Sequence, residues 1–212
     1  MRSVGIDAHA IGMRKGGNET YALALLKGLT EIGSADFRFV VFLSEKVTVP
    51  DFLVNNPLFR TVFVSPRAGA RIFQLSRKVN TEKIQLLHTQ YHVPPFCPCS
   101  CVITFHDVSF LRYPQFFPRG LCWRLKISMR YAVGKAKKII TVSEFSRKEI
   151  LSLYKIPAEK VVTIYNGYSD IFRPIAQEKR ASLAKFGITK PYILSVSNLQ
   201  PRKNLSRLIQ AF

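Results

Sequence analysis

Short apolar runs alternate with longer helical patterns along most of the chain, and this alternation limits the possible folds most strongly. The expected strands lie at residues 4–7, 37–43, 60–64, 84–88, 101–105, 138–142 and 161–164. Several are continuous apolar runs, which is typical of strands buried on both faces of a parallel sheet. Repeated β-α units with right-handed crossovers predict an α/β fold, with a Rossmann-like, doubly wound, mostly parallel sheet. Ligands bind such sheets beyond the carboxyl ends of the strands.

The composition changes near residue 166 and suggests a domain boundary. Residues 166–170 are turn-rich, residues 176–186 are polar, and residues 192–196 form a new buried-strand pattern. We therefore predict a first domain over residues 1–170, a linker over 171–190, and the first strand and helix start of a second Rossmann-like domain over 191–212. We expect this second domain to be truncated here, because one strand and half a helix bury their apolar faces poorly.

The charge is strongly basic, since 32 lysines and arginines face 13 acidic residues for a formal net charge of +19. Such a balance favours anionic partners: nucleic acid, anionic lipid or phosphorylated substrates. No apolar run is long enough to span a bilayer, and the N-terminus lacks a signal-peptide pattern. We expect a cytoplasmic chain, with the inner face of the cell membrane as a candidate surface.

A basic stretch from Arg112 to Lys138 contains no acidic residue and has aromatic side chains interleaved. This mixture fits contact with anionic lipid, and it also fits a solvated helix whose apolar side is core. The membrane-facing candidates are Arg119, Trp123, Arg124, Lys126 and Arg130. No nucleic-acid-binding motif accompanies the charge, so nucleic acid is disfavoured as a partner.

The four cysteines do not match a metal site. Cys97, Cys99 and Cys101 alternate with other residues, whereas structural zinc sites use pairs separated by two to four residues. With no further Cys or His pair to complete a site, reduced and partly buried thiols are the favoured interpretation together with Cys122, and we expect no metal.

Three loops that follow expected strands could carry chemistry. Gly16 and Gly17 open the first helix, where free N–H groups favour a phosphate, although an ordinary flexible turn fits equally well; Asn18 is the expected helix cap. His106 could bind a sugar hydroxyl or transfer a proton, and Asp107 could orient it or bind a hydroxyl; a polar pair at a strand end is the alternative.

The third loop carries two cations. Arg202 and Lys203 stand before the helix that begins near Leu205, where they would attract a diphosphate. Solvated surface charges are the alternative, and the position between a strand and a helix argues against it.

Taken in order, these segments resemble the retaining glycosyltransferases called group 1 or family 4. The motifs are Gly16-Gly17 with Glu19 and Tyr21, Phe105-His106-Asp107, residues 140–146, residues 166–174 and residues 192–205. The resemblance covers the whole chain, and the last segment is its most specific part.

The resemblance implies the GT-B arrangement, in which two Rossmann-like domains face a cleft and a sugar is transferred from a nucleotide-sugar with retention. It places His106 and Asp107 at the reacting sugar and Asn18, Glu19 and Asn166 near the acceptor or sugar. It also assigns the donor diphosphate to Gly16, Gly17, Arg202 and Lys203. It suggests mannose or rhamnose as the sugar and a saccharide or lipid-linked acceptor in surface polysaccharide synthesis, without a metal or other cofactor.

The sequence departs from the family pattern in its last part. The later Glu-x7-Glu motif is absent, and Ser197 and Asn198 stand where many members carry an arginine. We therefore expect the chain to be inactive alone, and a non-catalytic anion- or lipid-binding module with the same fold remains an alternative. Salt-sensitive liposome binding without sugar-nucleotide turnover would distinguish it.

Overall fold

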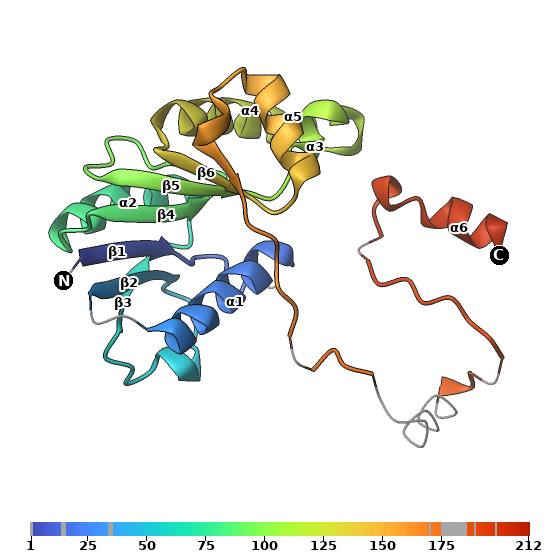
Figure 1. Ribbon diagram of the computed structural model, residues 1–212, viewed down its shortest axis with the longest axis horizontal. Coiled ribbons are helices and arrows are strands. Elements are labelled where there is room, and N and C mark those ends of the chain that lie inside the picture. The colour runs from blue at the N-terminus through green and yellow to red at the C-terminus, as the bar shows by residue number, and fades with distance from the viewer. Residues whose placement is uncertain are drawn as a thin grey trace.

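A single parallel sheet forms the centre of the molecule. The computed structural model describes residues 2–13, 16–33, 36–169, 171–174, 186–188, 190–197 and 199–212. Within these ranges seven parallel strands pair in the order β3-β2-β1-β4-β5-β6-β7 (Figure 1). They are β1 (Arg2–Asp7), β2 (Phe37–Ser44), β3 (Phe59–Val64), β4 (Leu86–Gln90), β5 (Ser100–Phe105), β6 (Lys138–Thr141) and β7 (Val161–Thr163). The predicted Rossmann-like α/β fold is confirmed.

The helices follow the strands as expected. The α-helices are α1 (Gly17–Ile32), α2 (Ala68–Thr81), α3 (Ser109–Arg112), α4 (Arg119–Lys135), α5 (Glu144–Tyr154) and α6 (Leu205–Ala211). Short 3₁₀ turns are η1 (Asp51–Leu53), η2 (Pro114–Phe116), η3 (Ala158–Lys160) and η5 (Pro201–Lys203). Ser143 caps α5, because its Oγ accepts the Ser146 backbone N–H at 3.1 Å.

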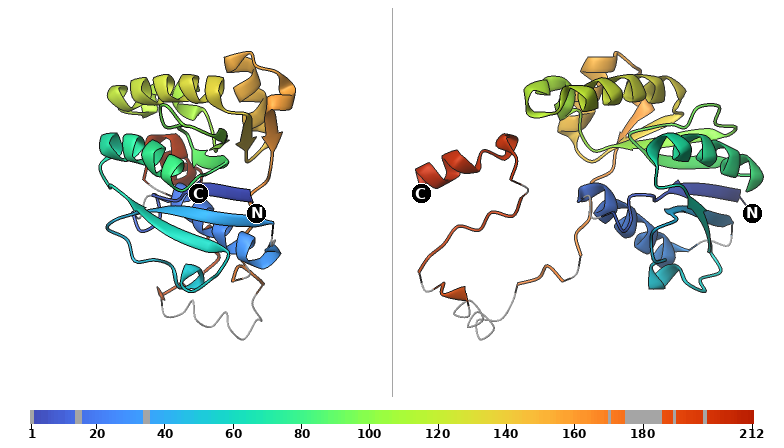
Figure 2. Two further views of the ribbon diagram at one scale, coloured as in Figure 1. Left: turned by 90° about the vertical axis from the view of Figure 1, so that its left-hand side faces the viewer. Right: turned by 180° about the vertical axis from the view of Figure 1, so that it is seen from behind.

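Two apolar cores lie on opposite faces of the sheet, since successive strand residues point to opposite sides. Val41 and Leu43 of β2 pack with Leu26 of α1, whereas Val40 and Phe42 belong to the core that contains residues of α2, α4 and α5. Figures 1 and 2 show α1 apart from these other helices, across the sheet. The face changes because the strand order reverses at β1, which makes the carboxyl ends of β1 and β4 the switch point where ligands bind such folds.

The expected strand over residues 192–196 does not form. Residues 191–197 have no regular secondary structure, and Val196 and Leu194 are largely exposed. A strand needs a neighbour to complete its hydrogen bonds, and the sheet described here ends at β7 without pairing to this segment. The helix expected after Leu205 does form, as α6, and stands away from the sheet in Figure 1.

Candidate functional site

His106 lies just beyond the carboxyl end of β5, beside the end of β4. Its Nε2 is 2.8 Å from the Oε1 of Gln90, which is the last residue of β4. Gln90 is almost fully buried, and its Nε2 donates to the backbone carbonyl of Asn18 in the first turn of α1 at 3.1 Å. A chain of hydrogen bonds therefore connects the start of α1 to His106.

This chain determines which His106 nitrogen carries the proton. Because the amide nitrogen of Gln90 donates to the Asn18 carbonyl, its oxygen faces His106 and must accept from Nε2–H. Burial lowers the pKa of His106 below its usual value of 6.5, although the Asp107 charge opposes this shift. The favoured form is a neutral imidazole with an unprotonated Nδ1, which can accept a hydrogen bond from a hydroxyl group.

Two tyrosines pack around His106. The Tyr21 ring meets it edge to face at 4.9 Å, and Tyr91 lies 5.6 Å away at a tilt of 47°. Tyr91 adopts the left-handed backbone region, with φ 60°, which is costly for a residue with a side chain. Strained residues cluster at functional sites, so Tyr91 is a site residue that pattern analysis of the sequence missed.

Asp107 does not orient the His106 ring, contrary to one expectation from the sequence. Its Oδ1 accepts the backbone N–H of Ser109 at 3.0 Å and the Ser109 hydroxyl at 2.8 Å. Asp107 therefore holds the start of α3, and Gln90 takes the orienting role. The role of the Gln90 amide could not be predicted from the sequence, because a glutamine at a strand end follows no distinctive spacing.

The start of α1 differs from the expected cap. Gly16 is the N-cap, with φ 74°, and Asn18 lies inside the helix, so the prediction that Asn18 caps it was wrong. A Cβ at Gly16 or Gly17 would meet nothing within 4 Å, so both glycines border open space. The Glu19 carboxylate accepts the Gly12 N–H at 2.8 Å and thereby braces the loop before the helix.

The other predicted site residues, two for the donor diphosphate and one for the acceptor or sugar, are exposed. Arg202 donates to the Gln200 side chain at 2.8 Å, and its guanidinium lies 5.9 Å from the Phe117 ring centre. Burial raises the pKa of Tyr91, and the Arg202 charge acts against that rise. Lys203 and Asn166 are also exposed.

A second cluster at the switch point was not foreseen. The carboxylate of Asp7, at the end of β1, is fully buried and lies 2.8 Å from the His9 Nδ1 and 3.1 Å from the His92 Nε2. Burial disfavours the Asp7 charge, yet His9 and His92 hold the pKa of this carboxyl well below its usual range. His9 is close to Asp7 in sequence, but His92 is far from it and reaches Asp7 because β1 pairs with β4.

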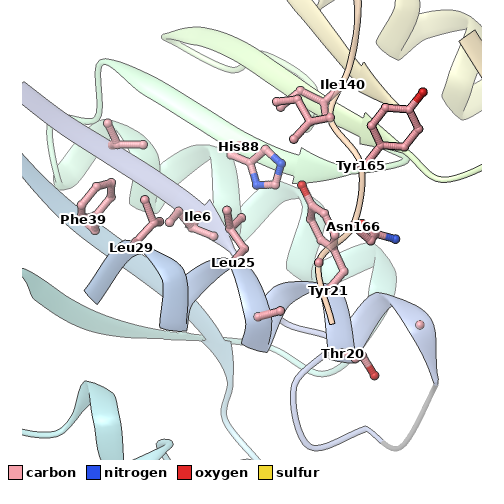
Figure 3. Close-up of a pocket in the computed structure, with 15 residues that line it drawn as sticks. Ile6, Thr20, Tyr21, Leu25, Leu29, Phe39, His88, Ile140, Tyr165 and Asn166 are labelled. Carbon is pink, nitrogen blue, oxygen red and sulfur yellow. The ribbon is translucent and has the colours of Figure 1, made fainter. Parts of the chain in front are cut away.

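A pocket of about 570 Å³ lies on the α1 face of the sheet (Figure 3). Its walls are mostly apolar and include Leu25 and Leu29, and its polar rim contains Tyr21, Gly17 and Asn166. Such walls suit an apolar or uncharged group better than a charged one. His88 lines the pocket, and burial lowers its pKa to about 4, which keeps the ring neutral.

The membrane-facing candidates lie on the outer surface of α4. Arg119, Trp123, Arg124, Lys126 and Arg130 are all exposed, and the Lys126 ammonium sits 5.6 Å from the Trp123 ring centre. Trp123 and Ile127 are each 65% exposed, whereas Met129 and Ala132 face the core. The aromatic residue is therefore not needed for the core. No helix in the described part of the chain is long and apolar enough to cross a membrane.

In the described residues, no group of three or more His, Cys, Asp or Glu side chains is arranged to hold a metal ion.

The family model of glycosyltransferase family 4 matches residues 15–170 of this chain. The chain belongs to glycosyltransferase family 4. The match includes Gly16, Gly17, Gln90 and His106, so the hydrogen-bonded chain described above lies within the family's domain.

Similar proteins agree with this assignment. The O-antigen chain mannosyltransferase B of Escherichia coli is 34% identical over 113 residues, which cover 52% of this chain and 30% of that protein. Anabaena Alr3699/HepE in complex with UDP-glucose matches the whole chain with a TM-score of 0.67 and 16% identity, over 57% of its own length. A glycosyltransferase from Rickettsia africae matches 89% of this chain and 50% of its own, with a TM-score of 0.54 and 15% identity. This family 4 chain thus spans 30% of the curated relative and about half of the solved ones.

The hydrogen bond between Gln90 and His106 can be tested through the pKa of His106. In Gln90→Glu a carboxylate would face the imidazole, and we expect it to raise the pKa of His106, because a nearby negative charge favours the imidazolium. Nuclear magnetic resonance titration of the histidine side chains measures this directly. Gln115→Glu, on the exposed η2 turn, is the control and should leave the titration unchanged. An unchanged His106 titration in Gln90→Glu would contradict the arrangement.

Proposed function

We propose that this family 4 protein transfers a sugar from a nucleotide-sugar to a saccharide or lipid-linked acceptor, with retention at the anomeric carbon. Mannose is the preferred candidate for the sugar, with rhamnose as the second. The mannosyltransferase name of the Escherichia coli relative supports mannose and a role in surface polysaccharide synthesis. No metal is required in this scheme.

The observation that carries the proposal is the hydrogen-bonded chain from the start of α1 through Gln90 to His106. It fixes a neutral imidazole beside the N-terminus of a 16-residue helix, at the sheet edge where ligands bind such folds. The helix N-terminus suits a diphosphate, and the unprotonated Nδ1 suits a sugar hydroxyl. A group that suits the diphosphate and a group that suits the sugar of a nucleotide-sugar thus lie next to each other.

Arg202 and Lys203 are proposed to complete the diphosphate site and to stabilise the charge that develops on the leaving group. Their place just before α6 and the position of the Arg202 guanidinium over the Phe117 ring support this role. Asn166 and the Gly17 backbone line one pocket rim, which agrees with a position near the acceptor or sugar.

The experiment is to incubate the full-length protein, because this chain is expected to be inactive alone, with GDP-mannose, dTDP-rhamnose and UDP-glucose in separate reactions, and to measure nucleotide release and binding heat. We expect one donor to bind, and transfer to require an added saccharide or lipid-linked acceptor. Absence of binding to every donor, together with salt-sensitive vesicle binding, would favour the non-catalytic anion- or lipid-binding alternative.

We further propose that α4 contacts an anionic membrane surface. The side chains at positions 123, 126, 127 and 130 follow helical spacing, and they combine an exposed tryptophan and isoleucine with two cations. Amphipathic cationic helices of this kind lie in the interface plane of membranes. A lipid-linked acceptor would be met at that surface.

Trp123 is the single tryptophan, so its fluorescence reports this contact. We expect vesicles containing phosphatidylglycerol to shift the emission to shorter wavelength, and phosphatidylcholine alone to have little effect. In the double variant Lys126→Ala/Arg130→Ala, binding should weaken roughly 30-fold, because each cation near the surface contributes about 1 kcal/mol. The control Lys27→Ala/Lys46→Ala removes two exposed cations from other elements and should bind normally. Equal weakening in both would point to net charge alone.

A further inference from the structure

Three cysteine thiols converge at the amino-terminal end of β5. The Sγ of Cys101, inside β5, lies 3.4 Å from the Sγ of Cys97, and the Cys99 Sγ lies 3.7 Å from the same atom. The fourth cysteine, Cys122, sits apart on α4 with the Pro114 carbonyl at 3.8 Å. The four cysteines are free, so three reduced sulfurs share one small volume.

Cys97 is the reactive member of this group. The Cys101 thiol donates a hydrogen bond to its sulfur, and this bond, followed by that of Cys99, lowers the pKa of Cys97 despite partial burial. The same contact raises the pKa of Cys101, which is buried. Thiolates are the nucleophiles of cysteine chemistry, and Cys97 is only half-buried, so an external reagent can reach it.

We propose that Cys97 and Cys101 form a thiol–disulfide exchange site for small-molecule disulfides of the glutathione class. The Cys97 thiolate attacks one sulfur of the reagent, whose S–S bond breaks, and the first reagent thiolate leaves and takes up a proton. Cys101 then loses its proton and attacks the Cys97 sulfur, which releases the second reagent thiol. Two protein thiols are oxidised to one disulfide, and one reagent disulfide is reduced to two thiols.

The geometry suits the second step. The two sulfurs must approach from 3.4 Å to about 2.05 Å, the length of a disulfide bond. Cys97 lies in the loop between β4 and β5, and a loop residue can move more readily than Cys101, which is held in the sheet. The site lies at the opposite end of β5 from His106, so the proposal is independent of the proposed transferase function.

The test uses the Cys99→Ser/Cys122→Ser variant, which keeps only the proposed pair. Incubation with oxidised glutathione should lower its intact mass by about 2 Da through an internal disulfide. Adding Cys101→Ser should instead retain a glutathione adduct of about 305 Da, because the second thiol is missing. The matched control Cys99→Ser/Cys101→Ser keeps Cys97 with the distant Cys122 and should also retain the adduct.

A pH series gives the second readout, on the wild-type protein. Peptide mass spectrometry should find that alkylation of Cys97 by iodoacetamide falls much less between pH 8 and pH 5 than that of free glutathione, whose ordinary thiol should slow by roughly several hundredfold. The groups acting on the Cys97 sulfur are the Cys101 and Cys99 thiols and the Cys99 backbone. No internal disulfide in the pair variant, or alkylation of Cys97 that falls as steeply as that of glutathione, would overturn the proposal.

Discussion

Replacing His106 with alanine in the full-length protein should lower the rate of sugar transfer by about 100- to 1,000-fold, in line with the loss of a positioned proton-accepting or hydroxyl-binding group. Its neutral Nδ1 is the group that we place against the sugar, and Gln90 holds the ring from the other side. The free energy of unfolding should fall by only about 1 kcal/mol, because the Gln90 oxygen loses one partner. Steady-state kinetics with the identified donor, together with urea unfolding, separates the two effects.

The role proposed for His106 also predicts how the rate of sugar transfer depends on pH. Transfer needs the neutral imidazole, and burial lowers the pKa of His106 below 6.5, so activity should persist below about pH 6.5 and then decline as the ring is protonated. In Gln90→Glu, the acidic decline should begin at higher pH. A His106→Ala enzyme with wild-type rates would remove His106 from the mechanism and leave only a packing role beside Tyr21.

Lys203→Ala is a companion measurement at the donor side. Loss of the ammonium should weaken nucleotide-sugar binding and slow transfer, since a cation beside the diphosphate stabilises the departing charge. Arg207→Ala removes another exposed cation, in the first turn of α6, and should have little effect. Equal effects of the two variants would argue for general attraction rather than a specific contact.

Replacing Asp7 with asparagine should lower the free energy of unfolding by about 3 kcal/mol or more at neutral pH, which is more than we expect for the His106 or Asp51 variants. The carboxylate is fully buried between His9 and His92, and the neutral amide removes the charge that both imidazoles face. Urea unfolding at pH 7 measures the change. Asp51→Asn, at an exposed turn, should cost less than about 0.5 kcal/mol.

The free energy of unfolding measured at low pH should show how much the Asp7 charge contributes. Because the pKa of Asp7 is held well below its usual range in the folded state, its contribution is complete above the unfolded value, near about pH 4. It is lost as the pH falls further, through the folded value. The difference between wild type and Asp7→Asn should therefore shrink below about pH 4. A difference that stays constant into strong acid would show that packing, rather than charge, accounts for the effect.

The class of fold could be predicted from residue patterns because burial on both faces leaves a continuous signal in each strand. Residues 37–43 and 101–105 are examples, and both predicted strands are present as β2 and β5. The position of His106 followed as well, because the carboxyl ends of parallel strands meet at one edge. The family resemblance was confirmed for residues 15–170.

Two local predictions failed for reasons that lie outside their own segments. Residues 192–196 have the composition of a buried strand, but a strand forms only where another strand accepts its hydrogen bonds. Asn18 has a side chain that often caps helices, but Gly16, two residues earlier, is the N-cap of α1. The Asn18 backbone carbonyl instead accepts a hydrogen bond from the side-chain amide of Gln90.

The parallel sheet and the edge at which chemistry is expected could be predicted from the order of the residues, because both depend on periodicity along the chain. Which groups meet at that edge depends on how the strands pair and the helices pack. Gln90 faces His106 across 16 positions, and Asp7 faces His92 across the β1–β4 pair, so no local spacing could reveal either contact. The charge state of His106 and Asp7 follows from those neighbours and from burial, which arise when the strands pair and the helices cover them.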